Sequence, residues 1–142
     1  MIPVDRIAAI RESYNHCFGC GQENPIGLGL DDFERDDNIV TASFLPRPDY
    51  HGFADVLHGG IVASALDAIM AWTAILVENV MVMTGTLDLR FRKPARVSSS
   101  FDLEGTLLQR RGRRLQIEGR MMDDGKLVAE ASGLFLTVVD PS

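Results

Sequence analysis

Residues 58–78 read HGGIVASALDAIMAWTAILVE, and this stretch decides the fold. From Ile61 to Val77 it holds 17 residues with a single charged side chain, that of Asp67. An apolar run of this kind predicts a helix that is buried on nearly all sides. The run is short for a membrane span and has a carboxylate near its middle, so we expect no membrane insertion.

Asp67 shares one face of the predicted helix with small or acidic residues that follow three- and four-residue steps. They are Gly60, Ala63, Ser64, Ala71, Ala74 and Glu78. This face leaves room for a partner backbone or a thin ligand, and a carboxylate in such apolar surroundings is expected to be buried and reactive. His58, Gly59 and Gly60 are suited to open the helix, whose first N–H groups favour negative charge. Together these features indicate chemistry on a carbonyl group, and the alternative is a core helix with one hydrogen-bonded aspartate.

The rest of the chain predicts a sheet. Patterns of apolar residues predict strands at 38–45, 82–93, 101–109, 114–122 and 127–139, with turns at Gly112 and at 123–125. The N-terminal segment predicts a short amphipathic helix with Ile2, Ile7 and Ile10 inward, followed by a loop at 17–29. The order of strand, long helix and antiparallel meander indicates an α+β fold with one sheet around one helix. A single sheet cannot cover so apolar a helix, so we expect a dimer that extends the sheet.

Composition narrows the classes of function. The 142 residues suggest one domain, and a net charge of −6 argues against general nucleic-acid binding. The N-terminus lacks a signal-peptide pattern, so a cytoplasmic protein is expected. Residues 88–120 nevertheless hold nine of the fourteen Lys and Arg residues. The densest groups could bind a small phosphorylated ligand or form a solvated strand face and a basic turn. They include Arg90, Arg92, Lys93, Arg111, Arg113 and Arg114.

Four motifs resemble those of the hotdog-fold acyl-CoA thioesterases of the PaaI-like (phenylacetate-pathway) group. They are CFGCGQENPIGLGL at 17–30, LHGGIVASALDAIM at 57–70, TGTLDLRFRKPARV at 84–97 and DDGKLVAEASGLF at 123–135, and the RGRR turn at 111–114 adds to the resemblance. The resemblance implies a hotdog fold over 17–139, with 1–16 as an N-terminal extension of the same domain. It also implies a homodimer or homotetramer with active sites between protomers. The implied reaction is hydrolysis of a small-to-medium acyl or aryl thioester of coenzyme A, with no separate cofactor because coenzyme A is part of the substrate.

The resemblance assigns roles to individual positions. Asp67 matches the catalytic acid, acting as nucleophile or general base, and the Gly59 N–H matches the group that polarises the thioester oxygen. His58 is expected to orient this loop. Thr84 matches a hydroxyl residue contributed by the partner chain, with Thr86 as the alternative. The expected substrate and coenzyme A contacts are Gly60, His51, Arg90, Arg92, Lys93, Arg111, Arg113 and Arg114.

Departures from the family pattern keep other functions open. Related enzymes often carry Asn or Gln six residues before the HGG histidine, where this chain has Gly52, and the adjacent His51 is the available substitute. A non-catalytic acyl-CoA-binding protein is therefore the main alternative, ahead of a hotdog hydratase or dehydratase. Cys17 and Cys20, with His16, supply only three of the four ligands that zinc prefers, so we expect no metal site and a reduced pair of thiols.

Overall fold

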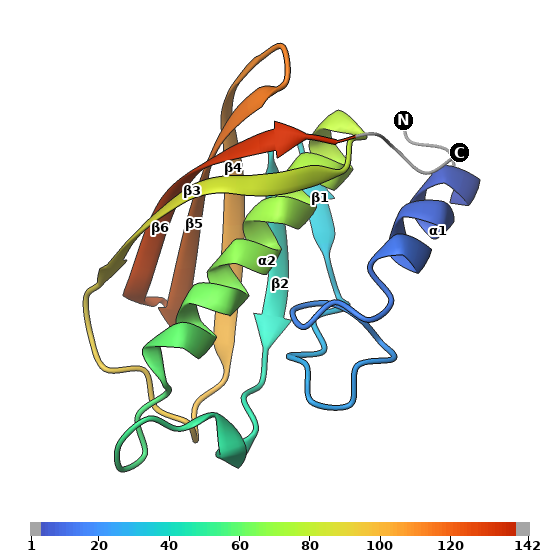
Figure 1. Ribbon diagram of the computed structural model, residues 1–142. Coiled ribbons are helices and arrows are strands. Elements are labelled where there is room, and N and C mark those ends of the chain that lie inside the picture. Colours follow the sequence, from blue (N-terminus) through green and yellow to red (C-terminus); the bar gives the residue numbers. More distant parts are fainter. Residues whose placement is uncertain (1–3, 139–142) are drawn as a thin grey trace.

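The computed structural model describes residues 4–138, in which one antiparallel sheet curves around the long helix α2 (Gly59–Glu78) (Figure 1). The six strands lie in the order β1-β2-β4-β5-β6-β3. Their bounds are β1 Glu34–Asp36, β2 Ile39–Phe44, β3 Val82–Phe91, β4 Phe101–Arg111, β5 Arg114–Asp123 and β6 Lys126–Thr137. The predicted α+β hotdog fold, one sheet wrapped around one central helix, is confirmed.

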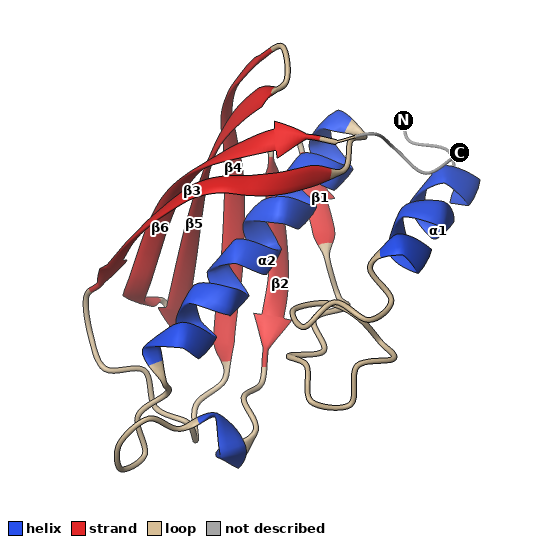
Figure 2. Ribbon diagram, viewed as in Figure 1, coloured by secondary structure: helices blue, strands red, loops and turns tan. Residues whose placement is uncertain are grey.

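The five predicted strands are all present, and the structure adds β1, a three-residue strand with exposed side chains that pairs with β2. Helix α1 (Val4–Ser13) lies to one side of the sheet, and a 3-10 turn, η1 (Pro48–Tyr50), precedes α2 (Figure 2). The predicted inward side of α1 is correct at Ile10, which is fully buried. Ile7 is only half-buried, and Ile2 lies outside the described residues.

Three glycines on neighbouring strands let α2 approach the concave face of the sheet. A Cβ added at Gly105 of β4 would lie 2.0 Å from Thr73 Oγ1. Cβ atoms added at Gly119 and Gly133, on β5 and β6, would lie 2.8 Å and 3.1 Å from atoms of Met70. Close packing of this kind leaves no space for a side chain, so these glycines fix how deeply the helix lies in the sheet.

Helix α2 ends at Glu78, and Asn79 is its C-cap: the backbone of Asn79 is left-handed (φ 58°) and its N–H donates to the Ile75 carbonyl. The helix is long and apolar enough to cross a membrane by composition alone, but core helices share these properties. In this fold more than half of its most apolar window is buried. Its apolar surface therefore has a partner in the sheet.

Candidate active site

Asp67 lies on the side of α2 that the sheet leaves partly uncovered. Its side chain is half-buried, as are those of Ala63, Ser64 and Ala71 on the same face, whereas Ala74 is fully buried. The small-residue face of the helix is thus partly exposed at most of its positions. The prediction that Asp67 is buried is wrong for the single chain, because its face of the helix is turned away from most of the sheet.

Thr84 holds the carboxylate of Asp67. The Thr84 hydroxyl donates a hydrogen bond of 2.6 Å to Asp67 Oδ1, which is short, as bonds to an ionised acceptor are. One carboxylate oxygen is therefore fixed by this bond and the other is left for substrate or water. The contact joins α2 to the start of β3 within one chain. The expectation that Thr84 reaches Asp67 from a partner chain is wrong in this respect.

A β-bulge decides which of the two candidate threonines faces the helix. Thr84 pairs with Phe135 and Thr86 with Leu134, so Gly85 is an extra residue in β3. Residues two apart in a regular strand share a face, but the extra residue puts Thr84 and Thr86 on opposite faces. The Thr86 hydroxyl accepts the Leu134 N–H at 3.3 Å instead, so Thr86 does not substitute for Thr84.

The start of α2 has a side-chain cap. His58 is the N-cap residue, and its Nδ1 accepts the Gly60 N–H at 2.9 Å. His58 therefore fixes the loop-to-helix junction, but it also occupies the N–H of Gly60, a predicted substrate contact. Gly59 is the first helical residue, so its N–H has no partner within the helix and can donate outward.

Beside Gly59 lies a hollow of about 300 Å³ with mostly apolar walls. A Cβ added at Gly59 would lie 3.7 Å from the ring of Phe91, which is 58% exposed at the end of β3. Arg92 and Lys93 line the same hollow, together with Phe53. Phe91 was not among the predicted site residues. Its inward position at the end of an alternating strand was the available signal.

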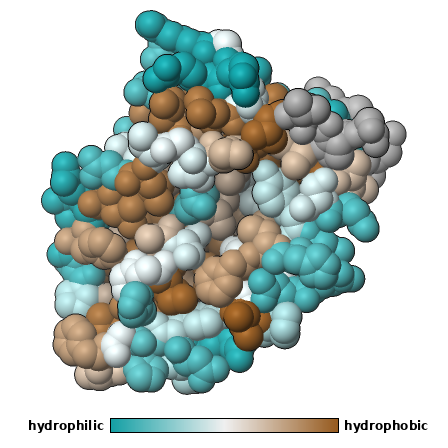
Figure 3. All heavy atoms as spheres, in the orientation of Figure 1, coloured by the Kyte–Doolittle hydropathy of each residue, from teal (hydrophilic) through white to brown (hydrophobic). Residues whose placement is uncertain are grey.

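The six predicted basic contacts divide among three places. Arg92 and Lys93 lie near Gly59, and Arg92 is paired with Glu130 at 2.8 Å. Arg90 faces the outer side of the sheet, in a charged hollow of about 430 Å³. The remaining three, Arg111, Arg113 and Arg114, lie at or beside the β4–β5 turn, the hydrophilic projection in Figure 3.

The segment before α2 contains the two remaining candidates. The backbone of His51 forms an isolated β-bridge with Leu57, and its side chain is exposed to solvent. The N–H of Gly52 bonds to the Val56 carbonyl at 2.7 Å, and a Cβ there would lie 3.3 Å from His58 Cα. Gly52 therefore lets this loop lie directly against the residue that caps α2.

Fold and site together define a hotdog domain with an acidic residue on its central helix. The chain belongs to the thioesterase superfamily, whose family model matches residues 54–130. It is 29% identical over 134 residues to acyl-coenzyme A thioesterase THEM4 of Bos taurus, a match that covers 92% of this chain and 54% of that protein. The chain thus spans about half the length of this relative.

Solved structures share the fold. The thioesterase superfamily protein RHA08564 superposes with a TM-score of 0.79 and 25% identity, covering 86% of this chain and 63% of that chain. A phenylacetic acid degradation-related protein from Ralstonia eutropha JMP134 gives a TM-score of 0.71 and 21% identity, covering 78% and 86%. The sheet wrapped around a central helix is therefore common to this chain and these proteins.

Proposed function

We propose that this protein is an acyl-CoA thioesterase that hydrolyses a small-to-medium acyl or aryl thioester. The observation that carries the proposal is the Asp67–Thr84 pair, a carboxylate held at one oxygen and half-exposed on the open face of α2. A positioned carboxylate of this kind can remove a proton from water or attack a carbonyl carbon. Membership of the thioesterase superfamily and the similarity to THEM4 support the thioester of coenzyme A as the substrate.

We propose that each active site combines two chains. Gly59 and Asp67 are eight residues apart on one helix, which places them about 12 Å apart along its axis. A donor to the carbonyl oxygen and a group acting on the carbonyl carbon must each lie about 3 Å from their targets. One chain cannot meet both conditions. Asp67 of one chain and Gly59 of a second chain can.

Strand β3 offers the surface for this pairing. It is the last strand in the sheet order and most of its side chains are exposed, including Met83 at 62%. Apolar surface is visible along this side of the molecule in Figure 3. Thr84, near the start of β3, contacts Asp67, and Phe91, at its end, lies beside Gly59. Antiparallel pairing of two β3 strands about a two-fold axis near Leu87 would bring the start of one strand to the end of the other.

The chemistry follows from these positions. The Gly59 N–H, at the positive end of α2, stabilises the negative charge that develops on the thioester oxygen. As a general base, Asp67 takes a proton from the water that adds to the carbonyl carbon and returns it to the departing sulfur, so coenzyme A leaves as the thiol. As a nucleophile, Asp67 displaces the coenzyme A thiolate to form a mixed anhydride, which water then hydrolyses. Lys93, and Arg92 beside it, are placed to contact coenzyme A phosphates near Gly59, since both line that hollow.

A panel of acyl-CoA thioesters with a thiol-detecting reagent tests the proposal. We expect release of coenzyme A by the wild type and a loss of about 10²- to 10⁴-fold in kcat for Asp67→Asn, with binding retained. A single turnover in ¹⁸O-labelled water separates the two roles of Asp67. A general base gives labelled acid in the first turnover. A nucleophile gives unlabelled acid, with ¹⁸O in Asp67, when water attacks the Asp67 carbonyl of the anhydride, so unlabelled acid identifies the nucleophile.

Position 52 is Gly rather than Asn or Gln, and this favours a second candidate function, an acyl-CoA-binding protein without turnover. The same panel discriminates between the two. Saturable binding of acyl-CoA with no coenzyme A release above background would overturn the thioesterase proposal and support the binding protein.

A further inference from the structure

The turn Cys17-Phe18-Gly19-Cys20 packs against α2 at Ala68 and carries two free thiols, which the proposed hydrolysis does not use. The Gly21 N–H bonds to the Cys17 carbonyl at 2.8 Å, which closes one helix-like turn. Side chains three residues apart in such a turn lie on the same side. The two thiols act on each other, and of the two only Cys20 is buried, at 8% exposure, while Cys17 is half-buried.

The surrounding packing holds this turn in place. A Cβ at Gly19 would lie 2.7 Å from the Ala68 Cβ on α2, and one at Gly21 would lie 2.4 Å from the Cys17 nitrogen. Backbone bonds from Leu28 to Phe18, at 2.7 Å, and from Leu30 to Gly19, at 3.1 Å, tie the turn to the chain that follows it. The two sulfurs are therefore held near each other by the fold rather than meeting by chance.

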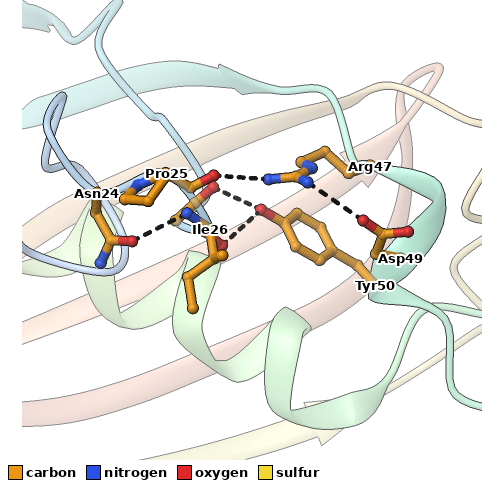
Figure 4. A network of polar contacts seen from close by, with 7 residues as sticks. Asn24, Pro25, Ile26, Arg47, Asp49 and Tyr50 are labelled. Carbon is orange, nitrogen blue, oxygen red and sulfur yellow. Dashed lines mark hydrogen bonds and ion pairs between the residues drawn. The ribbon is translucent and has the colours of Figure 1, made fainter.

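The loop after the turn is fastened as well. Figure 4 shows Arg47 and Tyr50, from the η1 region, pointing at the backbone of this loop. The Arg47 guanidinium donates to the Pro25 carbonyl at 2.9 Å, and the Tyr50 hydroxyl contacts the carbonyls of Ile26 and Gly27. The loop that follows the two thiols is therefore anchored to the η1 region.

The two thiols differ in their electrostatic surroundings. The Cys20 thiol donates to the Cys17 sulfur, and this bond, with the N–H groups of Cys20 and Gly19, holds the pKa of Cys17 at about 5. Burial and the negative charge of Asp67 on α2 oppose this effect. The interaction with Cys17 and burial raise the pKa of Cys20, against smaller opposite effects from Trp72 and Arg11. At neutral pH the more exposed sulfur is a thiolate and the buried one remains a thiol.

We propose that Cys17 and Cys20 form a redox-active dithiol that undergoes thiol–disulfide exchange with low-molecular-weight disulfides. The Cys17 thiolate attacks one sulfur of the small disulfide, which breaks its S–S bond and releases one thiolate. Cys20 then gives up its proton to solvent and attacks the Cys17 sulfur of the mixed disulfide, releasing the second small thiol. The protein loses two hydrogens and gains one disulfide, and the small disulfide is reduced to two thiols.

Trp72 provides a direct readout of this reaction. It is the single tryptophan of the chain, is 2% exposed and belongs to the same buried cluster as Cys20. Within residues 4–138 its indole N–H makes no hydrogen bond of standard geometry, yet its interaction with the Cys20 sulfur lowers the pKa of that thiol. A disulfide accepts an electron from an excited indole, so oxidation at Cys20 should quench the fluorescence of Trp72.

The equilibrium test uses the full chain in mixtures of reduced and oxidised glutathione. We expect one two-electron transition in Trp72 fluorescence, accompanied by the loss of two titratable thiols and of two hydrogens in mass. Cys20→Ser, and Cys20→Ala if the serine variant does not fold, should stop at a single glutathione adduct on Cys17. The proposal would be overturned if the folded wild type kept both thiols in the most oxidising glutathione mixture while the unfolded protein showed two fully reactive thiols.

The kinetic test measures the rate of exchange with an aromatic disulfide at pH 5. It compares Cys17 with a free thiol of ordinary pKa, about 8.5. Cys17 has roughly a thousandfold more thiolate at this pH, and its lower basicity reduces the nucleophilicity of each thiolate. The net expectation is a rate about 30- to 60-fold above that of the free thiol. Cys20→Ala should remove most of this advantage, because it removes the donor to the Cys17 sulfur. A rate equal to that of the free thiol would contradict the assignment of Cys17 as the nucleophile.

Discussion

Replacing Thr84 with valine tests the Asp67–Thr84 pair most directly, because valine keeps the shape of the side chain and removes only the hydroxyl. The lost contact is the 2.6 Å hydrogen bond to Asp67 Oδ1. Hydrogen bonds to charged groups contribute roughly 1.5–3 kcal/mol. Thr84 is exposed in the single chain, so we take the lower end. About 1.5 kcal/mol corresponds to about a tenfold loss in kcat, with KM nearly unchanged because Thr84 orients the acid rather than binding substrate.

The assay is steady-state release of coenzyme A, with two matched controls. Thr84→Ser keeps a hydroxyl and should retain most of the activity. Thr86→Val removes the hydroxyl that accepts from Leu134 on the other face and should leave kcat unchanged. In an Asp67→Asn background, Thr84→Val should add little further loss, since it acts through Asp67. Full activity of Thr84→Val, or an equal loss in Thr84→Ser, would refute the positioning role.

Two further predictions concern binding and stability. Lys93→Ala should raise KM for acyl-CoA about fivefold, through a lost phosphate contact of about 1 kcal/mol, and leave KM for a pantetheine thioester unchanged. Arg113→Ala is the matched control, because the Arg113 guanidinium binds a backbone carbonyl instead. It should leave both KM values unchanged. Gly105→Ala should lower the free energy of unfolding by about 1–3 kcal/mol in denaturant titration, because its Cβ would lie 2.0 Å from Thr73 Oγ1. Adding Thr73→Ala should recover part of this loss, and an additive double variant would contradict the proposed clash.

The fold could be predicted from the sequence because its signals are local. An apolar helix bounded by His58-Gly59 and Asn79, followed by alternating segments separated by Gly112 and 123–125, leaves few arrangements besides one helix in one sheet. Strand β1 was missed because three polar residues, Glu34 to Asp36, have no apolar alternation to detect. It forms only because β2 offers an edge for pairing. The strand ends differ from the prediction by at most two residues.

The candidate site was harder to predict because its parts depend on contacts between distant segments. The charge of Asp67 made it recognisable in the sequence. The position of the Phe91 ring beside Gly59 could not be predicted, because Phe91 belongs to the far end of β3. The basic residues illustrate the same limit. Arg92 and Arg113 look alike in the sequence, yet one lines the hollow beside Gly59 and the other binds the carbonyl of Thr137 in the neighbouring strand.

The choice between Thr84 and Thr86 shows why side-chain facing is the last thing a sequence reveals. Both are threonines in one strand, two residues apart, and a regular strand would aim them at the same face. Gly85 changes this, because a Cβ at that position would lie 3.0 Å from the Leu134 carbonyl and the strand bulges there. The bulge turns Thr84 to the helix and Thr86 to the outer face. A glycine in a strand is compatible with a bulge but does not require one. The pairing of β3 with β6 therefore decides which threonine of β3 faces Asp67. The positioning role of Thr84 depends on that pairing rather than on the TGT motif itself.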